Sequence, residues 1–261
     1  MFDFHMHTTV SYDGHSTAQE MAQAALQAGL KEICFTDHLD YEMARPKAEL
    51  TFTPEAYSRM YDGFSMPGLT VRKGVEIGMT PWNVEEVSRD LSQRPFDFVI
   101  GSVHHVDDLD LYFEPFWRGK TVPEAERQYF DEMLKCVQLH DNFDVLGHMT
   151  YISKTAAHPA PRLVPLADHR DIIAAIMEVL VTKDKGMEIN ASGVDRVGDF
   201  LPGEDYLRLF KDLGGKIVTM GSDAHSAPRV GKHADRAVAL LKDIFGYVCT
   251  FSGRQPTFHK L

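Results

Sequence analysis

The sequence predicts an α/β protein, most simply a distorted (β/α)7 barrel formed as a single domain over residues 1–261. Short apolar runs alternate with helical patterns along the chain, in about seven strand–helix units, and polar residues follow most of the runs. Repeated units of this kind are typical of a parallel sheet, which closes into a barrel or stays open and doubly wound. The open sheet remains the alternative.

Each predicted element rests on a local pattern. The predicted strands are the short apolar runs at residues 1–6, 32–36, 69–75, 98–103, 144–146, 186–189 and 216–220. Helical patterns lie between most of them, at residues 17–29, 123–140, 167–183, 203–213 and 232–245. The first helix is bounded by Thr17 and Glu20, spaced as a capping box, and by Gly29 as a C-terminal stop. The Pro-rich segment 158–165 is expected to be a loop.

The composition is that of an ordinary globular enzyme, 44% hydrophobic and 25% charged. Its 27 Lys and Arg against 38 Asp and Glu, net −11, argue against nucleic acid or an anionic membrane surface as the main partner. Cys34, Cys136 and Cys249 lie in apolar stretches and are expected to be buried, reduced thiols. No signal peptide is visible and no apolar run approaches the ~20 residues of a membrane span, so we expect a cytoplasmic protein.

Potential metal ligands recur where the predicted strands end. Asp3, His5 and His7 alternate at period two, which places them on one face of the first strand. The later endings are Thr36-Asp37-His38, Gly74-Val75-Glu76, Ser102-Val103-His104, Gly147-His148 and Gly221-Ser222-Asp223-Ala224-His225. The carboxyl ends of barrel strands are the face that carries active sites. A single histidine at a strand end is usually an ordinary polar residue, but many unpaired donors at one mouth would be costly to desolvate without metal ions.

These motifs, together with Phe35-Thr36-Asp37-His38-Leu39-Asp40-Tyr41 and Glu188-Ile189-Asn190-Ala191-Ser192-Gly193, resemble the ordered motifs of the PHP (polymerase and histidinol phosphatase) family. Three segments are particularly similar to the stand-alone histidinol-phosphatase branch: residues 35–41, residues 188–193 and Phe98-Val99-Ile100-Gly101-Ser102-Val103-His104. The resemblance runs from residue 3 to about residue 231 and implies a distorted seven-stranded β/α barrel with up to three metal ions at its rim.

By position, the resemblance implies three ligand sets. The first metal would be held by His5, His7, Glu76 and Asp223, the second by Glu76, His104 and His148, and the third by His38, His225 and His15. His15 lies in a loop, so a surface histidine is the competing interpretation. His104 is preferred to His105 because strand alternation places it on the same face as Ser102. The remaining histidines, His140, His158, His169, His233 and His259, are not expected to be ligands.

Imidazole and carboxylate ligands suit two to three Zn, Mn or Fe ions, which can generate a hydroxide that attacks phosphorus directly. Glu76, Asp223 and His225 are the predicted catalytic residues, and Asp13, Asp37 and Asp40 are candidates for orienting ligands or moving protons. Arg162, Arg196 and Arg229 are predicted to bind the substrate, because guanidinium matches phosphate geometry. The segment 106–121, rich in aromatic and acidic residues, could wall a pocket for a substrate that carries an amine or imidazole.

Three functional interpretations follow. The first is a histidinol-phosphatase of histidine biosynthesis, which releases phosphate from a small phosphorylated substrate. The second is a PHP phosphoesterase that acts on nucleotides or another small phosphate ester. The third is a non-catalytic, metal-stabilised accessory module, which the presence of the main ligand residues disfavours. The sequence does not specify the metal, the oligomeric state or the physiological substrate.

Overall fold

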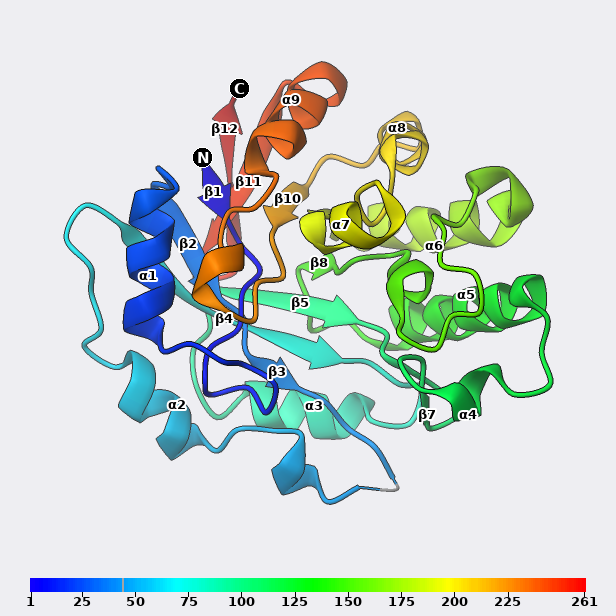
Figure 1. Cartoon of the computed structure of the whole chain (residues 1–261), viewed down its shortest axis with the longest axis horizontal. Coiled ribbons are helices and arrows are strands. Elements are labelled where there is room, and N and C mark those ends of the chain that lie inside the picture. The colour runs from blue at the N-terminus through cyan, green and yellow to red at the C-terminus, as the bar shows by residue number, and fades with distance from the viewer. Residues whose placement is uncertain (44) are drawn as a thin grey trace.

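Seven parallel strands follow one another around a sheet that nearly closes on itself (Figure 1). The structure is a computed structural model and describes residues 1–43 and 45–261. In order around the sheet, the strands are β1 (Phe2–Asp3), β2 (Glu32–Phe35), β4 (Thr70–Gly78), β5 (Phe98–Ser102), β8 (Val145–Leu146), β9 (Gly186–Asn190) and β10 (Val218–Gly221). A short strand, β3 (His38–Leu39), extends the β2 side and pairs with β4. The predicted distorted (β/α)7 barrel is confirmed.

The chain that follows β1 closes the barrel against the chain that follows β10. The amide of Phe4 donates to the carbonyl of Met220 at 2.9 Å, and a parallel bridge joins Met6 to Ala224. Gly221 makes this close approach possible, because a Cβ there would lie 2.2 Å from the Cβ of His5. The barrel therefore closes where its first and last strands meet.

Asp3 also joins these two segments. Its Oδ1 accepts a hydrogen bond from the amide of Ser222 at 2.9 Å, and its Oδ2 accepts one from the amide of Gly231 at 2.9 Å. Burial raises the pKa of Asp3 to about 6, although these hydrogen bonds lower it. Asp3 shares the period-two pattern of His5 and His7, but its carboxylate accepts hydrogen bonds from the backbone amides of Ser222 and Gly231.

Helices surround the strands (Figure 1). They are α1 (Ala18–Gln27), α2 (Pro54–Tyr61), α3 (Val84–Leu91), α4 (Glu114–Trp117), α5 (Val122–Leu139), α6 (Arg170–Thr182), α7 (Val194–Val197), α8 (Glu204–Asp212) and α9 (Ala234–Ile244). The capping box of Thr17 and Glu20 is present at the start of α1, with the Thr17 amide 2.7 Å from Glu20 Oε2. All five predicted helices are found, whereas α2 and α3, of eight residues each, are not among the predicted ones. Within the described residues, no helix is long and apolar enough to cross a membrane.

Two hairpins were not predicted. β6 (His105–Val106) pairs with β7 (Leu109–Asp110), and β11 (Tyr247–Ser252) pairs with β12 (Gln255–Lys260), both antiparallel. The second hairpin turns through Gly253 and Arg254, whose φ values are 55° and 65°. Two positive φ values are typical of the tight turn whose twist matches the strands on either side.

The β11–β12 hairpin covers the amino-terminal end of the barrel. Phe251 is 2% exposed and packs in an apolar cluster, where its ring centroid lies 4.8 Å from that of Phe98. The cluster also contains Phe4, Cys34, Ile100 and Val145. Arg254 fixes the turn through an ion pair with Asp144, Nε to Oδ2 at 2.6 Å. The hairpin therefore closes the end of the barrel opposite the strand ends that carry the histidines.

Replacing Phe251 with alanine should lower the free energy of unfolding by about 3–5 kcal/mol, because the change leaves a cavity among buried aromatic rings. Urea unfolding followed by circular dichroism would measure this. The matched control is Phe258→Ala on the paired strand, where the side chain is 51% exposed and the loss should stay near or below about 0.5 kcal/mol. Equal losses for the two variants would contradict the assigned role of Phe251.

Candidate metal centre

The carboxylate of Glu76, on β4, lies at the centre of the candidate site and is fully buried. Five histidines from four different segments of the barrel surround it. The ring nitrogens that approach Glu76 Oε2 belong to His5 (Nε2, 3.1 Å), His38 (Nδ1, 3.1 Å) and His7 (Nε2, 3.5 Å), and those that approach Oε1 belong to His148 (Nε2, 2.8 Å) and His104 (Nε2, 3.4 Å). One carboxylate is thus shared by two groups of imidazoles.

Asp223 and His225 add to this cluster from the segment after β10. Asp223 Oδ1 lies 3.4 Å from His7 Nε2 and 3.7 Å from His5 Nε2. The His225 ring stacks on that of His7 with centroids 4.2 Å apart. Asp223 has a φ of 55°, a conformation that is uncommon outside glycine, and its amide donates to the carbonyl of His5 at 2.8 Å.

Groups of three donors lie close enough together to hold a metal ion. They are His5, His7 and Asp223; His5, Glu76 and His148; His7, His38 and His225; His38, Asp40 and His104; and Glu42, His105 and Asp110. The first three overlap strongly with the three ligand sets implied by the sequence. The fourth group adds His104, so the structure brings eight of the nine predicted ligand residues together.

The donor atoms themselves fit a metal. His5 Nε2, His7 Nε2 and Glu76 Oε2 are buried and have no hydrogen-bond partner among the described residues, and the same holds for His38 Nδ1. A buried polar atom without a partner is costly, and a coordinated cation removes that cost. Neutral imidazole and carboxylate form a donor set that Zn, Mn and Fe accept.

The charges within the cluster are strongly coupled. Burial alone would raise the pKa of Glu76, but His5, His38 and His104 hold it well below its usual value. Burial would lower the pKa of His5, yet Glu188, Glu76 and Asp223 together raise it well above its usual value. The carboxylate is thus ionised in this environment, as a metal ligand must be.

Glu188, on β9, supports two of the histidines. Its Oε1 lies 2.7 Å from His5 Nδ1, and its Oε2 accepts a hydrogen bond from the amide of His148 at 2.8 Å. A carboxylate on the far nitrogen fixes the tautomer of a metal-binding histidine and increases its basicity. Sequence reasoning missed this role. Glu188 and Asn190, at period two in an otherwise apolar strand, were the available signal.

The three aspartates predicted to orient ligands differ in their contacts. Asp40 Oδ1 lies 2.9 Å from His104 Nδ1 and so orients that ring. Asp37 is buried and accepts hydrogen bonds from the amide of Thr8 at 2.7 Å and from Tyr61, so it holds the turn after β1. Asp13 Oδ2 lies 3.2 Å from His225 Nε2 and 3.6 Å from His38 Nε2.

His15, the ninth predicted ligand, is not brought into any of these groups. Its side chain is exposed and lines the cavity above the cluster, and its amide donates to the carbonyl of His225 at 2.8 Å. Asp13, two residues earlier, lies between His38 and His225 instead. His15 as a ligand stays a prediction.

A cavity of about 540 Å³ opens above the cluster. It is lined by five residues of the cluster, His38, His104, His148, Asp223 and His225, and by Lys154 and Tyr151. The lining also includes Arg45, His105, Asp110, Tyr112 and Phe113. The segment 106–121 thus contributes to the wall, although Phe116 and Trp117 are buried beneath it.

The three predicted substrate-binding arginines lie elsewhere. Arg162 pairs with Glu126 (Nη2 to Oε1, 3.1 Å). Arg229 pairs with Asp195 (Nη2 to Oδ2, 3.3 Å). Arg196 Nη2 donates to the carbonyl of Thr155 at 2.9 Å. Among the described residues, the cations that line the cavity are Lys154 and Arg45, and sequence reasoning singled out neither.

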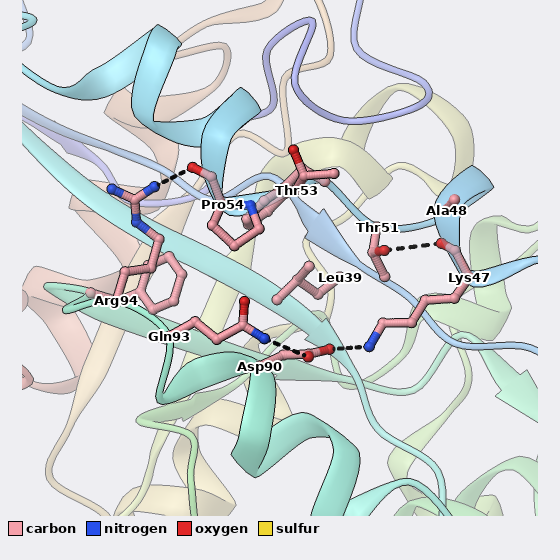
Figure 2. Close-up of a pocket in the computed structure, with 11 residues that line it drawn as sticks. Leu39, Lys47, Ala48, Thr51, Thr53, Pro54, Asp90, Gln93 and Arg94 are labelled. Atoms are coloured by element: carbon pink, nitrogen blue, oxygen red, sulfur yellow. Dashed lines mark hydrogen bonds and ion pairs between the residues drawn. The ribbon is translucent and has the colours of Figure 1, made fainter.

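A second cavity, of about 350 Å³, lies between β3, α2 and α3 (Figure 2). Figure 2 shows Lys47, Asp90 and Gln93 joined along one side, and Arg94 turned toward the carbonyl of Pro54. Its polar groups are thus paired with one another, and much of its lining is apolar. It contains none of the predicted ligands, which separates it from the metal centre.

Comparison with known proteins agrees with this geometry. Residues 3–192 match the PHP domain. The chain is 32% identical to the histidinol-phosphatase of Lactococcus lactis subsp. lactis over 96% of this chain and 94% of that protein, and 28% identical to a probable histidinol-phosphatase of Clostridium acetobutylicum over 93% of each. The crystal structure of the Lactococcus lactis histidinol phosphate phosphatase with Zn, L-histidinol and phosphate superposes with a TM-score of 0.89, at 30% identity and over 98% of both chains. With the barrel, the ordered motifs and these matches in agreement, the chain belongs to the PHP domain family.

Proposed function

We propose that this protein is a metal-dependent histidinol-phosphatase, which hydrolyses L-histidinol phosphate to L-histidinol and phosphate. The proposal rests on the convergence of histidines and carboxylates on Glu76, several of which line an open cavity. The similarity to histidinol-phosphatases along almost the whole chain supports the choice of substrate.

In this proposal two to three divalent ions, Zn, Mn or Fe, supply charge neutralisation and an activated water when bound. His5, His7 and Asp223 would hold one ion, Glu76 with His104 and His148 a second, and His38 with His225 a third. Glu76 would join the first two sets, because its two oxygens face different histidines.

The other catalytic roles fall to Asp223 and His225. Asp223 would position the activated water relative to the phosphoryl group, because its carboxylate lies beside His7 and also lines the cavity. The His225 side chain is 29% exposed, with Nε2 beside Asp13, so its catalytic role would be to hold an ion at the side of the cluster that faces the cavity.

Part of the cavity lining suits the cationic part of histidinol. Asp110 lines the cavity, and so does His105, whose Nε2 lies 2.9 Å from Glu42 Oε1. Tyr112 and Phe113 are 45% and 55% exposed beside them and offer flat apolar surfaces to an imidazole ring. Acidic and aromatic groups together match an amine and an imidazole better than a plain alkyl phosphate.

Replacing Glu76 with glutamine should reduce kcat/KM by about 10³-fold or more, because it removes a shared charged ligand and several kcal/mol of stabilisation. Metal content measured by elemental analysis should fall with it. The exposed Glu178 on α6 supplies the control, since Glu178→Gln should leave both values unchanged. Full activity of Glu76→Gln after chelation and metal reloading would contradict the assignment of Glu76 as a metal ligand.

Changing Glu188 to glutamine should weaken zinc affinity by about 10–100-fold, which is the usual effect of losing a carboxylate that orients a ligand histidine. The amide keeps the size of the side chain, so the fold should remain. Competition with a chelating dye measures the affinity, and unchanged affinity would show that the Glu188 contact to His5 does not tune the metal.

Substrate choice is tested by phosphate release from histidinol phosphate and from phenyl phosphate. Asp110→Asn should lower kcat/KM for histidinol phosphate by about 10–100-fold, the effect of losing a charged hydrogen bond, and should leave phenyl phosphate hydrolysis unchanged. Asp107→Asn, in the turn of the same hairpin and outside the cavity lining, is the control. Equal rates on both substrates for the unmodified protein would overturn the substrate assignment and leave the phosphatase intact.

A further inference from the structure

We infer that Asn190 is a positioning residue of the metal centre, and that its side-chain amide sets which nitrogen of His5 faces the metal. The role rests on the proposed metal-dependent function. Asn190 ends strand β9 and is fully buried. Its backbone is fixed by parallel pairing with Gly221 of β10 and by hydrogen bonds in both directions with Leu201. The side chain is therefore held in place at the strand end, beside the cluster.

The orientation of the Asn190 amide follows from its partners. The backbone N–H of Ser192 can only donate, and it donates to Asn190 Oδ1 at 3.0 Å. The NH2 group must therefore point the other way, where Nδ2 lies 3.1 Å from Glu188 Oε2. An amide accepts at one end and donates at the other, whereas an ionised carboxylate only accepts. The contacts at both ends thus require an amide side chain at this position.

The donor of Asn190 fixes how Glu188 meets His5. Glu188 Oε2 accepts from the backbone amide of His148 at 2.8 Å and from Asn190 Nδ2 at 3.1 Å, which leaves Oε1 for His5 Nδ1 at 2.7 Å. The competing contact, from Asn190 Nδ2 to His5 Nδ1, is 3.5 Å long, so the short contact to the carboxylate is the stronger one. Nδ1 of His5 therefore carries the proton, and the lone pair lies on Nε2.

Nε2 is the nitrogen of His5 that faces the cluster. It lies 3.1 Å from Glu76 Oε2 and 3.7 Å from Asp223 Oδ1, and it has no hydrogen-bond partner among the described residues. Imidazole binds a metal through an unprotonated nitrogen, so the hydrogen bonds behind His5 leave the correct atom free. Asn190 also reaches Asp223 through Ser192, whose Oγ lies 2.5 Å from Asn190 Oδ1 and 3.0 Å from Asp223 Oδ2. One asparagine thus links the supports of two residues in the first ligand set.

A purely structural role would use only half of this side chain. Asn190 caps the 3-10 helix Ala191–Gly193 through its Oδ1. Serine and aspartate serve about as well as asparagine at the start of a helix, so capping alone does not require the NH2 group. That group lies instead against the carboxylate behind His5. Replacing Asn190 with serine keeps a cap and removes the contact to Glu188, which separates the two roles.

The test measures zinc affinity by competition with a chelating dye, and circular dichroism checks that each variant is folded. Asn190→Ser should weaken zinc binding about tenfold or more, as expected when support for a ligand histidine is lost. In the Glu188→Gln background the same change should cause no further loss, because Asn190 acts through that carboxylate. Asn190→Asp, which also keeps the cap, takes the place of the serine variant if that variant does not fold.

The matched control is Asn142→Ser. Asn142 Oδ1 accepts from Arg254 Nη1 at 3.1 Å, at the end of the barrel that the β11–β12 hairpin covers. This variant loses the same chemical group far from the cluster, so it should bind zinc as the unmodified protein does.

Weaker zinc binding by the Asn190 variant, with no further loss in the Glu188→Gln background, supports the inference. Unchanged affinity overturns it, and so does an equal loss in both backgrounds, since Asn190 would then act on the fold rather than through Glu188. If the unmodified protein binds no zinc, the inference and the proposed function both fail. If zinc binding depends on Asn190 as expected but histidinol phosphate is not hydrolysed, the proposed substrate fails and the role of Asn190 stands.

Discussion

The buried carboxylate of Glu76 is the interaction on which the rest of the site depends. It lies within 3.5 Å of ring nitrogens from five histidines, which belong to four segments far apart in the sequence. A carboxylate in such a place is unfavourable unless positive charge surrounds it, and imidazoles packed together are unfavourable unless negative charge or a metal ion separates them. Each half of the cluster therefore stabilises the other. The barrel is the scaffold that brings these halves to one point, because its parallel strands all end on the same side.

Much of this arrangement could be predicted from local patterns. The period-two spacing of His5 and His7 specifies a common face, and the capping box of Thr17 specifies the start of α1; both depend only on residues close in the sequence. Alternation also predicted His104 over His105, and His104 does lie beside Glu76, whereas His105 pairs with Glu42. Eight of the predicted ligands converge, although their roles as ligands stay predictions.

What could not be predicted depends on contacts between distant segments. Glu188 acquires its role only because closure of the barrel brings β9 near the chain after β1, across β10, and places its carboxylate beside Nδ1 of His5. The arginines were chosen because guanidinium suits phosphate, yet Arg196 is used to hold backbone carbonyls, and a lysine outside any motif lies beside Asp223. The β11–β12 hairpin was missed because apolar and polar residues alternate only weakly along its strands. Its contribution to stability comes from Phe251, which fills the open end of the barrel. Spacing alone does not reveal which charges are already paired.

The closure between the first and last strands has a consequence for how the protein is made. Asp3 and the amide of Ser222 that it binds are 219 residues apart, and His5 and Asp223 flank this joint. During synthesis His5 and His7 emerge long before Asp223, so the carboxylate that completes the first ligand set is translated after Glu76, His104 and His148. The segment that carries Phe251, which seals the other end, comes later still. The first ligand set is therefore completed after the other residues around Glu76 have been translated, so binding of a metal ion there depends on the late arrival of β10 and the segment after it.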